Sequence, residues 1–285
     1  MTDPVLIRRP EPGTDRVVLV VTAHADDAAL FIGGTVAAWS ASGWRVVLVR
    51  VTDDRWDSVG LDEATTIERS AAELRLAAER LGVSEVVDLG WPTDTLADAS
   101  EVALREQVIR LIRTHRPHTI VTHDPHSGTG EDNLDHFVVG AAVAEAVWCA
   151  QFDLHHPEHL ADGLEVHGVF EQWYFGRPPG EVTHVVDTAP TLDQMVAAAA
   201  AHRTPLRNLI NQWRLQAHTG GWRIPLLNEV AATEPDHDLG ELIDPLLRSR
   251  AASTGAAHGL EAAEEFRVVT FGGMTELLEV FGEQI

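Results

Sequence analysis

Apolar and polar positions follow two different periods along the first half of the chain. Short continuous runs of Val, Leu and Ile are typical of buried parallel strands, and they occur at residues 17–22, 45–52, 85–89 and 119–122. Stretches with apolar residues three or four positions apart predict helices, at residues 28–42, 62–81, 101–113 and 134–149. This repeated strand–helix order predicts a Rossmann-like α/β fold, with a mostly parallel sheet and helices on both faces.

The pattern becomes less regular after about residue 150. Residues 166–175 and 182–186 predict two further strands, and residues 190–216 predict one long helix. The segment 218–244 is rich in Gly, Pro and Trp, which indicates a lid or an insertion and not a separate domain. We expect one domain over residues 1–285 with a helical C-terminal extension, in which about residues 205–260 form a lid or an insertion.

Composition and charge exclude several classes of protein. The formal net charge of -23 argues against binding to nucleic acid or to an anionic membrane, because both require basic patches. None of the 21 basic residues is Lys, which excludes Schiff-base chemistry and a P-loop lysine. The polar N-terminus and the single Cys149 predict a soluble, cytoplasmic protein with no membrane partner. The sequence leaves the oligomeric state open, a homo-oligomer included.

The first predicted strand ends at a cluster of side chains suited to metal chemistry. His24, Asp26 and Asp27 follow it directly, and ligands of open α/β sheets bind beyond the carboxyl ends of the strands. Imidazole and carboxylate together form a ligand set for zinc or a similar divalent metal. A capping role at the start of the next helix would explain one Asp, but neither the second Asp nor the His.

A second cluster follows the fourth predicted strand. His123 and His126 lie just after the strand, and Asn133 and His136 lie where the helix at 134–149 begins. Each of these histidines, taken alone, is explained as a polar loop or helix-start residue. Because parallel strands end at the same edge of a sheet, we expect the two clusters to lie close together.

Taken together, these motifs resemble a known family. His24-Ala25-Asp26-Asp27, Gly33-Gly34-Thr35 and Asn133-Leu134-Asp135-His136 are similar to the LmbE-like/PIG-L family of zinc-dependent N-deacetylases. The resemblance runs from about residue 17 to residue 140, and it resumes more weakly at 186–188, 202–204 and 264–267. It implies an LmbE-like fold and an enzyme that removes an acetyl or other acyl group from a small amino-sugar-like or antibiotic-type substrate.

The resemblance also implies roles for individual residues. His24, Asp27 and His136 would bind Zn²⁺ or another divalent metal, and Asp26 would act as general base toward an activated water. Arg69 and Asp94 would contact the substrate. Read from the residues alone, Arg69 would form a surface ion pair with Glu73 and Asp94 would be a turn residue.

One departure from the family pattern leaves the proton donor open. Asn133 stands where these deacetylases usually have a histidine, and an amide can donate a hydrogen bond but cannot deliver a proton. Either Asp26 returns the proton itself, or His126, His123 or His202 replaces the missing histidine; we expect His126 first, because its loop leads to the motif.

The same departure supports two alternative functions. A branch of the family that hydrates an unsaturated dicarboxylate also has Asn at this position, although the two adjacent carboxylates favour hydrolysis. A catalytically silent, metal-containing binding protein is the third reading, and the retention of Asp26 argues against it.

Overall fold

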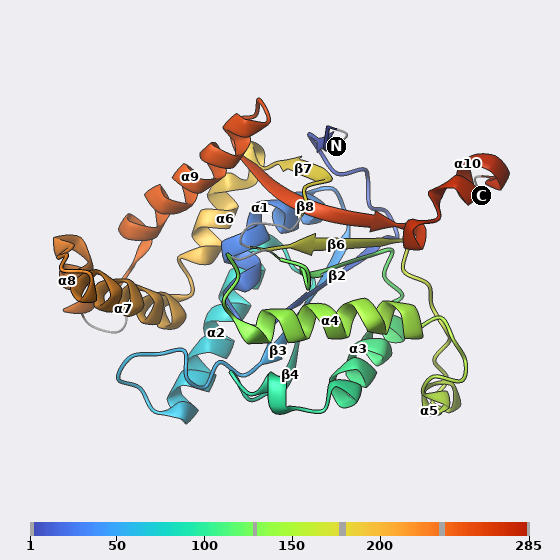
Figure 1. Ribbon diagram of the computed structural model, residues 1–285, viewed down its shortest axis with the longest axis horizontal. Helices are drawn as coiled ribbons and strands as arrows, with labels where there is room; N and C mark the ends of the chain where they lie inside the picture. The colour runs from blue at the N-terminus through green and yellow to red at the C-terminus, as the bar shows by residue number, and fades with distance from the viewer. Residues whose placement is uncertain (1–2, 128–129, 177–180, 234–236, 284–285) are drawn as a thin grey trace.

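One mixed eight-stranded sheet forms the centre of the molecule (Figure 1). The computed structural model describes residues 3–127, 130–176, 181–233 and 237–283. The strand order is β1-β7-β8-β6-β5-β2-β3-β4, and every pairing is parallel except those of β8 with β6 and β7. The strands are β1 (Val5–Ile7), β2 (Val17–Thr22), β3 (Arg45–Thr52), β4 (Glu85–Trp91), β5 (Thr119–His123), β6 (Glu171–Phe175), β7 (His184–Asp187) and β8 (Ala263–Thr270).

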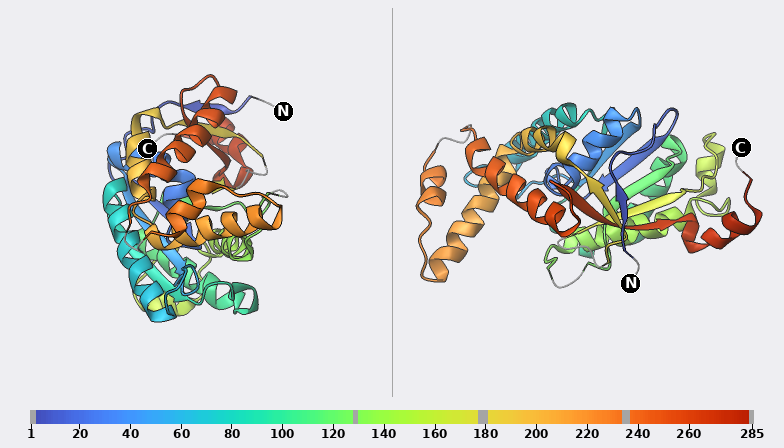
Figure 2. Two further views of the ribbon diagram at one scale, coloured as in Figure 1. Left: turned by 90° about the vertical axis from the view of Figure 1, so that its left-hand side faces the viewer. Right: turned by 90° about the horizontal axis from the view of Figure 1, so that it is seen from above.

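Helices cover both faces of this sheet (Figures 1 and 2). They are α1 (Asp27–Ala41), α2 (Glu63–Leu81), α3 (Glu101–His115), α4 (Leu134–Cys149), α5 (Pro157–Ala161), α6 (Leu192–Ala199), α7 (Arg203–Thr219), α8 (Pro225–Ala231), α9 (Gly240–Ala257) and α10 (Thr275–Phe281). Side chains alternate between the faces along a strand. Accordingly, Val18 and Val20 of β2 pack with α1, α2 and α6, whereas Leu19 and Val21 pack with α3 and α4. The predicted α/β fold with a mostly parallel sheet is confirmed.

The first half of the chain follows the sequence prediction closely. β2, β3 and α4 begin and end at the predicted residues, and β4, β5, α1, α2 and α3 differ by no more than two residues at either end. None of the helices in the described part of the chain is long and apolar enough to cross a membrane.

The prediction of one helix over 190–216 was wrong. Two helices occur instead, α6 and α7, and the backbone leaves helical geometry at His202, whose ψ is 63°. Glu73 of α2 accepts hydrogen bonds from the backbone N–H and the hydroxyl of Thr204, both at 2.9 Å. This contact from a distant helix stabilises a new helix start, and the alanine-rich sequence gives no sign of it. The segment 218–244, predicted as a lid or an insertion, contains α8 and the start of α9.

Helix α1 bends at Ile32, where φ is -138°. Beyond the bend, the N–H groups of Gly34 and Thr35 donate to the carboxylate of Glu264, at 2.9 and 2.8 Å. A Cβ on Gly34 would lie 2.7 Å from the side chain of Thr188, so this close approach requires glycine. The family-like residues Gly33 to Thr35 and Glu264 therefore join α1 to β8.

Candidate metal centre and its cavity

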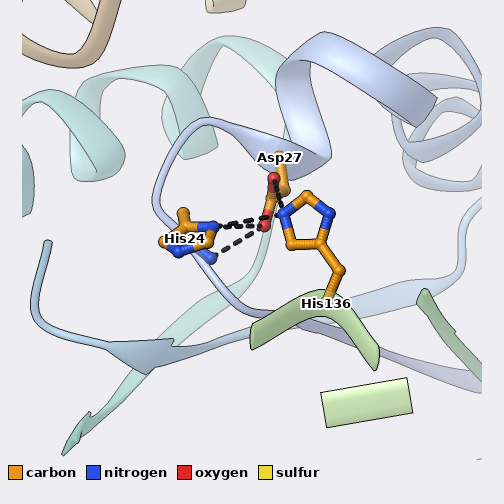
Figure 3. A group of neighbouring side chains, drawn as sticks. All are labelled: His24, Asp27 and His136. Carbon is orange, nitrogen blue, oxygen red and sulfur yellow. Dashed lines mark hydrogen bonds and ion pairs between the residues drawn. The ribbon is translucent and has the colours of Figure 1, made fainter. Parts of the chain in front are cut away.

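Three side chains converge at the carboxyl ends of β2 and β5 (Figure 3). His24 follows β2, Asp27 begins α1 and His136 lies in the first turn of α4. The distances are 3.2 Å from His24 Nδ1 to His136 Nε2, 3.2 Å from His136 Nε2 to Asp27 Oδ1 and 3.5 Å from His24 Nδ1 to Asp27 Oδ2. Ligand atoms about 2.1 Å from a tetrahedral zinc lie roughly 3.4 Å apart. The three residues therefore have the spacing of a divalent-metal site.

A second carboxylate lies behind each histidine. Glu131 Oε2 accepts from His136 Nδ1 at 2.9 Å, and Asp135 Oδ2 lies 3.6 Å from His24 Nε2. Such carboxylates fix the ring orientation and the tautomer of metal-binding histidines. Here they direct His136 Nε2 and His24 Nδ1 toward Asp27.

His123 supports the cluster from the sheet side. Its ring stacks on His136 with centroids 3.9 Å apart, and its Nε2 lies 3.2 Å from Asp27 Oδ2. Burial, followed by the charge of His136, lowers the pKa of His123 to about 4. A neutral, buried His123 is suited to position Asp27 and is poorly suited to supply a proton near neutral pH.

The electrostatics of the cluster fit a cation. Burial would lower the pKa of His136, but Asp27 and Glu131 outweigh it and raise the pKa to about 9. Burial would also lower the pKa of His24, but Asp135 and Asp27 outweigh it and raise this pKa well above its usual value. The neighbouring carboxylates thus stabilise a positive charge on both rings at neutral pH. A divalent metal bound to the two imidazoles would replace the protons that carry this charge.

Asp26 lies beside the cluster and opens onto a cavity. It occupies the N-cap position of α1 without making the usual side-chain capping hydrogen bond. Burial, followed by the charge of Asp27, raises the pKa of Asp26 to about 8. A carboxylate with a raised pKa that faces a cavity has the properties of a general base and acid.

Asn133 caps the helix that carries His136. Its Oδ1 accepts from the backbone N–H of Asp135 at 2.9 Å, and the residue lines the same cavity as Asp26. Because Oδ1 is engaged, the Nδ2 amide is the group that can donate toward a ligand.

The cavity at the cluster has a volume of about 460 Å³ and is strongly acidic. Asp26, Asp57, Asp94 and Asp132 contribute carboxylates, and no arginine lines it among the residues that the structure describes. Burial raises the pKa of Asp57 to about 7. Asp94 has a left-handed backbone, with φ of 58°, and its N–H donates to Asp135 Oδ2 at 2.7 Å. One side of helix α7 closes the cavity with Pro205, Asn208, Leu209 and Gln212.

The structure does not bring all the expected residues together. His126 is exposed and Arg69 is half-buried on α2, and neither lines the cavity. His202 is fully buried between α6 and α7 and does not line it either. The pKa of His202 is lowered to about 3 by burial. Glu131 and Asp135 complete the site and had no predicted role, because carboxylates are too common in loops for their positions to signal one.

Comparison with known proteins extends the resemblance found in the sequence. The family model for GlcNAc-PI de-N-acetylase (PIG-L) matches residues 19–147. A 1D-myo-inositol 2-acetamido-2-deoxy-alpha-D-glucopyranoside deacetylase of Mycobacteroides abscessus is 35% identical in an alignment of length 161 that covers 47% of this chain and 58% of that protein. The diacetylchitobiose deacetylase of Thermococcus kodakarensis is 26% identical over 91% of this chain and 85% of its own.

Solved structures share the fold over nearly the whole chain. The N,N'-diacetylchitobiose deacetylase of Pyrococcus horikoshii superposes with a TM-score of 0.72 and 21% identity, covering 95% of this chain and 89% of its own. The 4-carboxy-2-hydroxymuconate hydratase of Pseudomonas putida superposes with a TM-score of 0.62 and 17% identity, covering 89% and 96%.

The family match and the motifs fall on the same residues. The chain spans between 50% and 58% of the length of the deacetylases of Mycobacteroides abscessus and Mycobacterium leprae that it matches. Residues 19–147, which the family model matches, contain His24, Asp27 and His136 together with Asp26. Over residues 19–147 the chain is therefore similar to the PIG-L (LmbE-like) family.

Proposed function

We propose that this protein is a metal-dependent amidohydrolase that removes an acyl group from the nitrogen of a small amino sugar. The observation that carries the proposal is the buried cluster of His24, Asp27 and His136, with Asp26 facing the adjoining cavity. A structural metal site has four protein ligands, whereas three ligands beside a cavity leave a position for reactants.

Zinc is the metal that we propose, with two imidazoles and one carboxylate as ligands. The spacing of 3.2 to 3.5 Å between their donor atoms supports this choice. A zinc ion held there would lower the pKa of water and polarise the amide carbonyl of the substrate.

Two residues of the chain would then carry the reaction. Asp26 accepts the proton from the attacking water, and its raised pKa allows the protonated form to persist near neutral pH. Asn133 Nδ2 donates a hydrogen bond to the oxygen of the former carbonyl as charge develops on it. Asp26 then returns the proton to the departing amine, so that one carboxyl group serves as base and acid.

Asp26 is the proton donor that the geometry supports best. His126 was the first expectation, but it lies on the surface away from the cavity. His123 and His202 are buried, with pKa values lowered to about 4 and about 3. Both imidazoles are therefore neutral at neutral pH, and a neutral imidazole is too weak an acid to protonate a departing amine.

The substrate of this site would be neutral or cationic. Besides Asp27, the cavity has the carboxylates of Asp26, Asp57, Asp94 and Asp132, which suit sugar hydroxyls and amines. An unsaturated dicarboxylate, the substrate of the alternative hydratase, would meet repulsion from the same carboxylates. Asp94, which lines the cavity, remains our proposed substrate contact. Arg69 does not line the cavity and would act at most from outside it. Helix α7, at the start of segment 205–260, would be part of the lid.

Replacement of Asp26 by Asn tests the proposal. The variant should bind zinc as tightly as the unaltered protein but lose 10²- to 10⁴-fold in the rate of acetate release from N-acetylglucosamine derivatives. Asp98→Asn, at an exposed acid outside the cavity, is the matched control and should keep full activity. A parallel assay follows the ultraviolet absorbance of unsaturated dicarboxylates. Hydration of these compounds without any amide hydrolysis would reject the proposal in favour of a hydratase, and inactivity of the zinc-loaded protein on both would favour a binding protein.

A further inference from the structure

A second cavity lies next to the metal-binding cavity and differs from it in character. It has a volume of about 600 Å³. Its lining is mostly aliphatic and aromatic and comes from α1, β6, α6, α7, α9 and β8. Phe175 of β6 and Ala251 and Thr254 of α9 are among the lining residues.

The two cavities share part of their walls. Leu30, Phe31 and Leu209 line both of them. The ring of Phe31 meets the ring of His136 edge-on with centroids 6.2 Å apart, and on its other side it stacks on Phe175 at 5.9 Å. The apolar cavity therefore begins one aromatic ring away from a proposed metal ligand.

Polar and apolar groups occupy different sides of the site. The carboxylates of Asp57 and Asp94 come from the loops after β3 and β4, whereas the shared apolar wall comes from α1 and α7. In Figure 1, the loop between β3 and α2 lies on one side of α1 and α9 lies on the other. An amide also has two sides, the substituent on nitrogen and the chain on the carbonyl carbon. The carboxylates suit a sugar on the nitrogen, which leaves the apolar wall for the acyl chain.

We propose that the apolar cavity binds the aliphatic chain of an N-acyl group longer than acetyl, so that the protein is an N-deacylase of medium-chain N-acyl amino sugars. This inference rests on the proposed function. The reaction breaks the bond between carbonyl carbon and nitrogen, adds the oxygen of water to that carbon, and releases a fatty acid and a free amine. An acetyl group reaches only the shared wall, whereas each further methylene buries apolar surface inside the second cavity.

Arg250 of α9 lines the apolar cavity beside the shared wall. Its guanidinium lies over the ring of Phe31, 5.8 Å from the centroid, and donates to the carbonyl of Leu30. Arg250 thus holds the shared wall from the side of α9.

A methylene group moved from water to an apolar site gains about 0.8 kcal/mol, which corresponds to a roughly fourfold gain in kcat/KM for each methylene that fits.

The test measures kcat/KM of the zinc-loaded protein for N-acetyl-, N-butyryl-, N-hexanoyl- and N-octanoylglucosamine, by release of the free amine. We expect an increase of about three- to fourfold per methylene until the cavity is full. Ala251→Leu and Thr254→Leu each narrow the cavity, and they should remove most of the gain for the octanoyl substrate while leaving the N-acetyl substrate unaffected. Ala252→Leu, at the exposed neighbouring position of α9, is the matched control and should behave as the unaltered protein.

The outcomes separate the inference from the function on which it rests. Hydrolysis of the N-acetyl substrate together with slower hydrolysis of every longer chain would overturn the inference and leave the proposed function standing. No hydrolysis at any chain length would instead reject the proposed function. A gain with chain length that both cavity variants leave intact would also overturn the inference, because the chain would then lie elsewhere. The last measurement uses octyl glycosides of N-acetylglucosamine. If kcat/KM rises with these compounds alone, and if Ala251→Leu and Thr254→Leu remove that rise, the cavity binds the aglycone and the acyl assignment is rejected.

Discussion

Glu131 offers the most direct test of how the metal cluster is built. Its carboxylate uses both oxygens: Oε2 accepts from His136 Nδ1 at 2.9 Å, and Oε1 accepts from the backbone N–H groups of Asp132 and Asn133, each at 3.0 Å. The residue therefore orients one ligand and fixes the loop that leads into α4. Glu131→Gln keeps the shape of the side chain and replaces one of these acceptors by a donor.

Either orientation of the new amide is unfavourable. If its oxygen faces the backbone, its NH₂ group opposes His136 Nδ1, and the ring must place its proton on Nε2, the atom that faces Asp27. If its oxygen faces His136, two buried backbone N–H groups lose their acceptor, at about 1–3 kcal/mol for an unsatisfied group. Loss of a carboxylate behind a metal-binding histidine usually lowers metal affinity 10- to 100-fold, or about 1.4–2.7 kcal/mol. We expect this variant to fall in that range.

Competition with a zinc-binding dye measures the effect. The control is Glu145→Gln on α4, the helix that carries His136, where the carboxylate pairs with Arg105 near the surface, and it should leave zinc affinity unchanged. Unfolding by urea in the presence of a chelator reports separately on the stability of the metal-free protein. Zinc affinity within a factor of two of the unaltered protein in Glu131→Gln would refute the argument that this carboxylate sets the tautomer of His136.

Further predictions concern the stability of the metal-free protein, measured by urea unfolding. Arg50→Met leaves the side chain of Asp54, which is 2% exposed and 3.0 Å from Arg50, without its buried partner, and it should cost about 3–5 kcal/mol. Arg50→Met/Asp54→Asn should recover much of that, because Asn removes the buried charge and tolerates the left-handed backbone at this position, where φ is 56°. An undiminished loss in the double variant would contradict the prediction. Glu264→Gln should cost about 1–3 kcal/mol, because its amide opposes the N–H groups of Gly34 or Thr35; Glu265→Gln, outside this contact, is the control, and equal losses would contradict the prediction. Burial raises the pKa of Asp57 to about 7, above its unfolded value near 4, so its ionisation costs stability as pH rises from about 4 to 7. Asp57→Asn should therefore gain stability relative to the unaltered protein across that interval and show no further change above it; parallel pH curves would contradict this assignment.

Periodicity predicted the half of the fold that carries the metal cluster. Strand β2 is a run of aliphatic residues that ends at Thr22, and the run is buried on both faces. Because β2 and β5 are adjacent and parallel, the residues after both strands had to meet at one edge. Order along the chain was therefore enough to place His24 close to the helix start that carries His136.

The remaining parts of the site depend on contacts that no local pattern reveals. His126 lies in the loop toward the second motif, but Arg267 of β8 forms two hydrogen bonds with Asp124, at 2.9 and 2.7 Å. Asp124 in turn accepts from the N–H of His126 at 2.9 Å, and the imidazole lies at the surface. A residue 143 positions away from Asp124 thus determines the course of this loop. Sequence proximity to a motif is a weak guide wherever a distant strand holds the loop.

Helix α1 lines both cavities, and its position therefore affects both of them. Its first turn carries Asp27 of the metal cluster, and the next carries Leu30 and Phe31, which separate the polar cavity from the apolar one. The bend at Ile32 and the hydrogen bonds from Gly34 to Glu264 fix the helix against β8 just beyond this wall. A shift of α1 would therefore move a proposed metal ligand and the wall of the apolar cavity together. The Gly33-Gly34-Thr35 motif contributes no side chain to either cavity, and its role is to hold both in register.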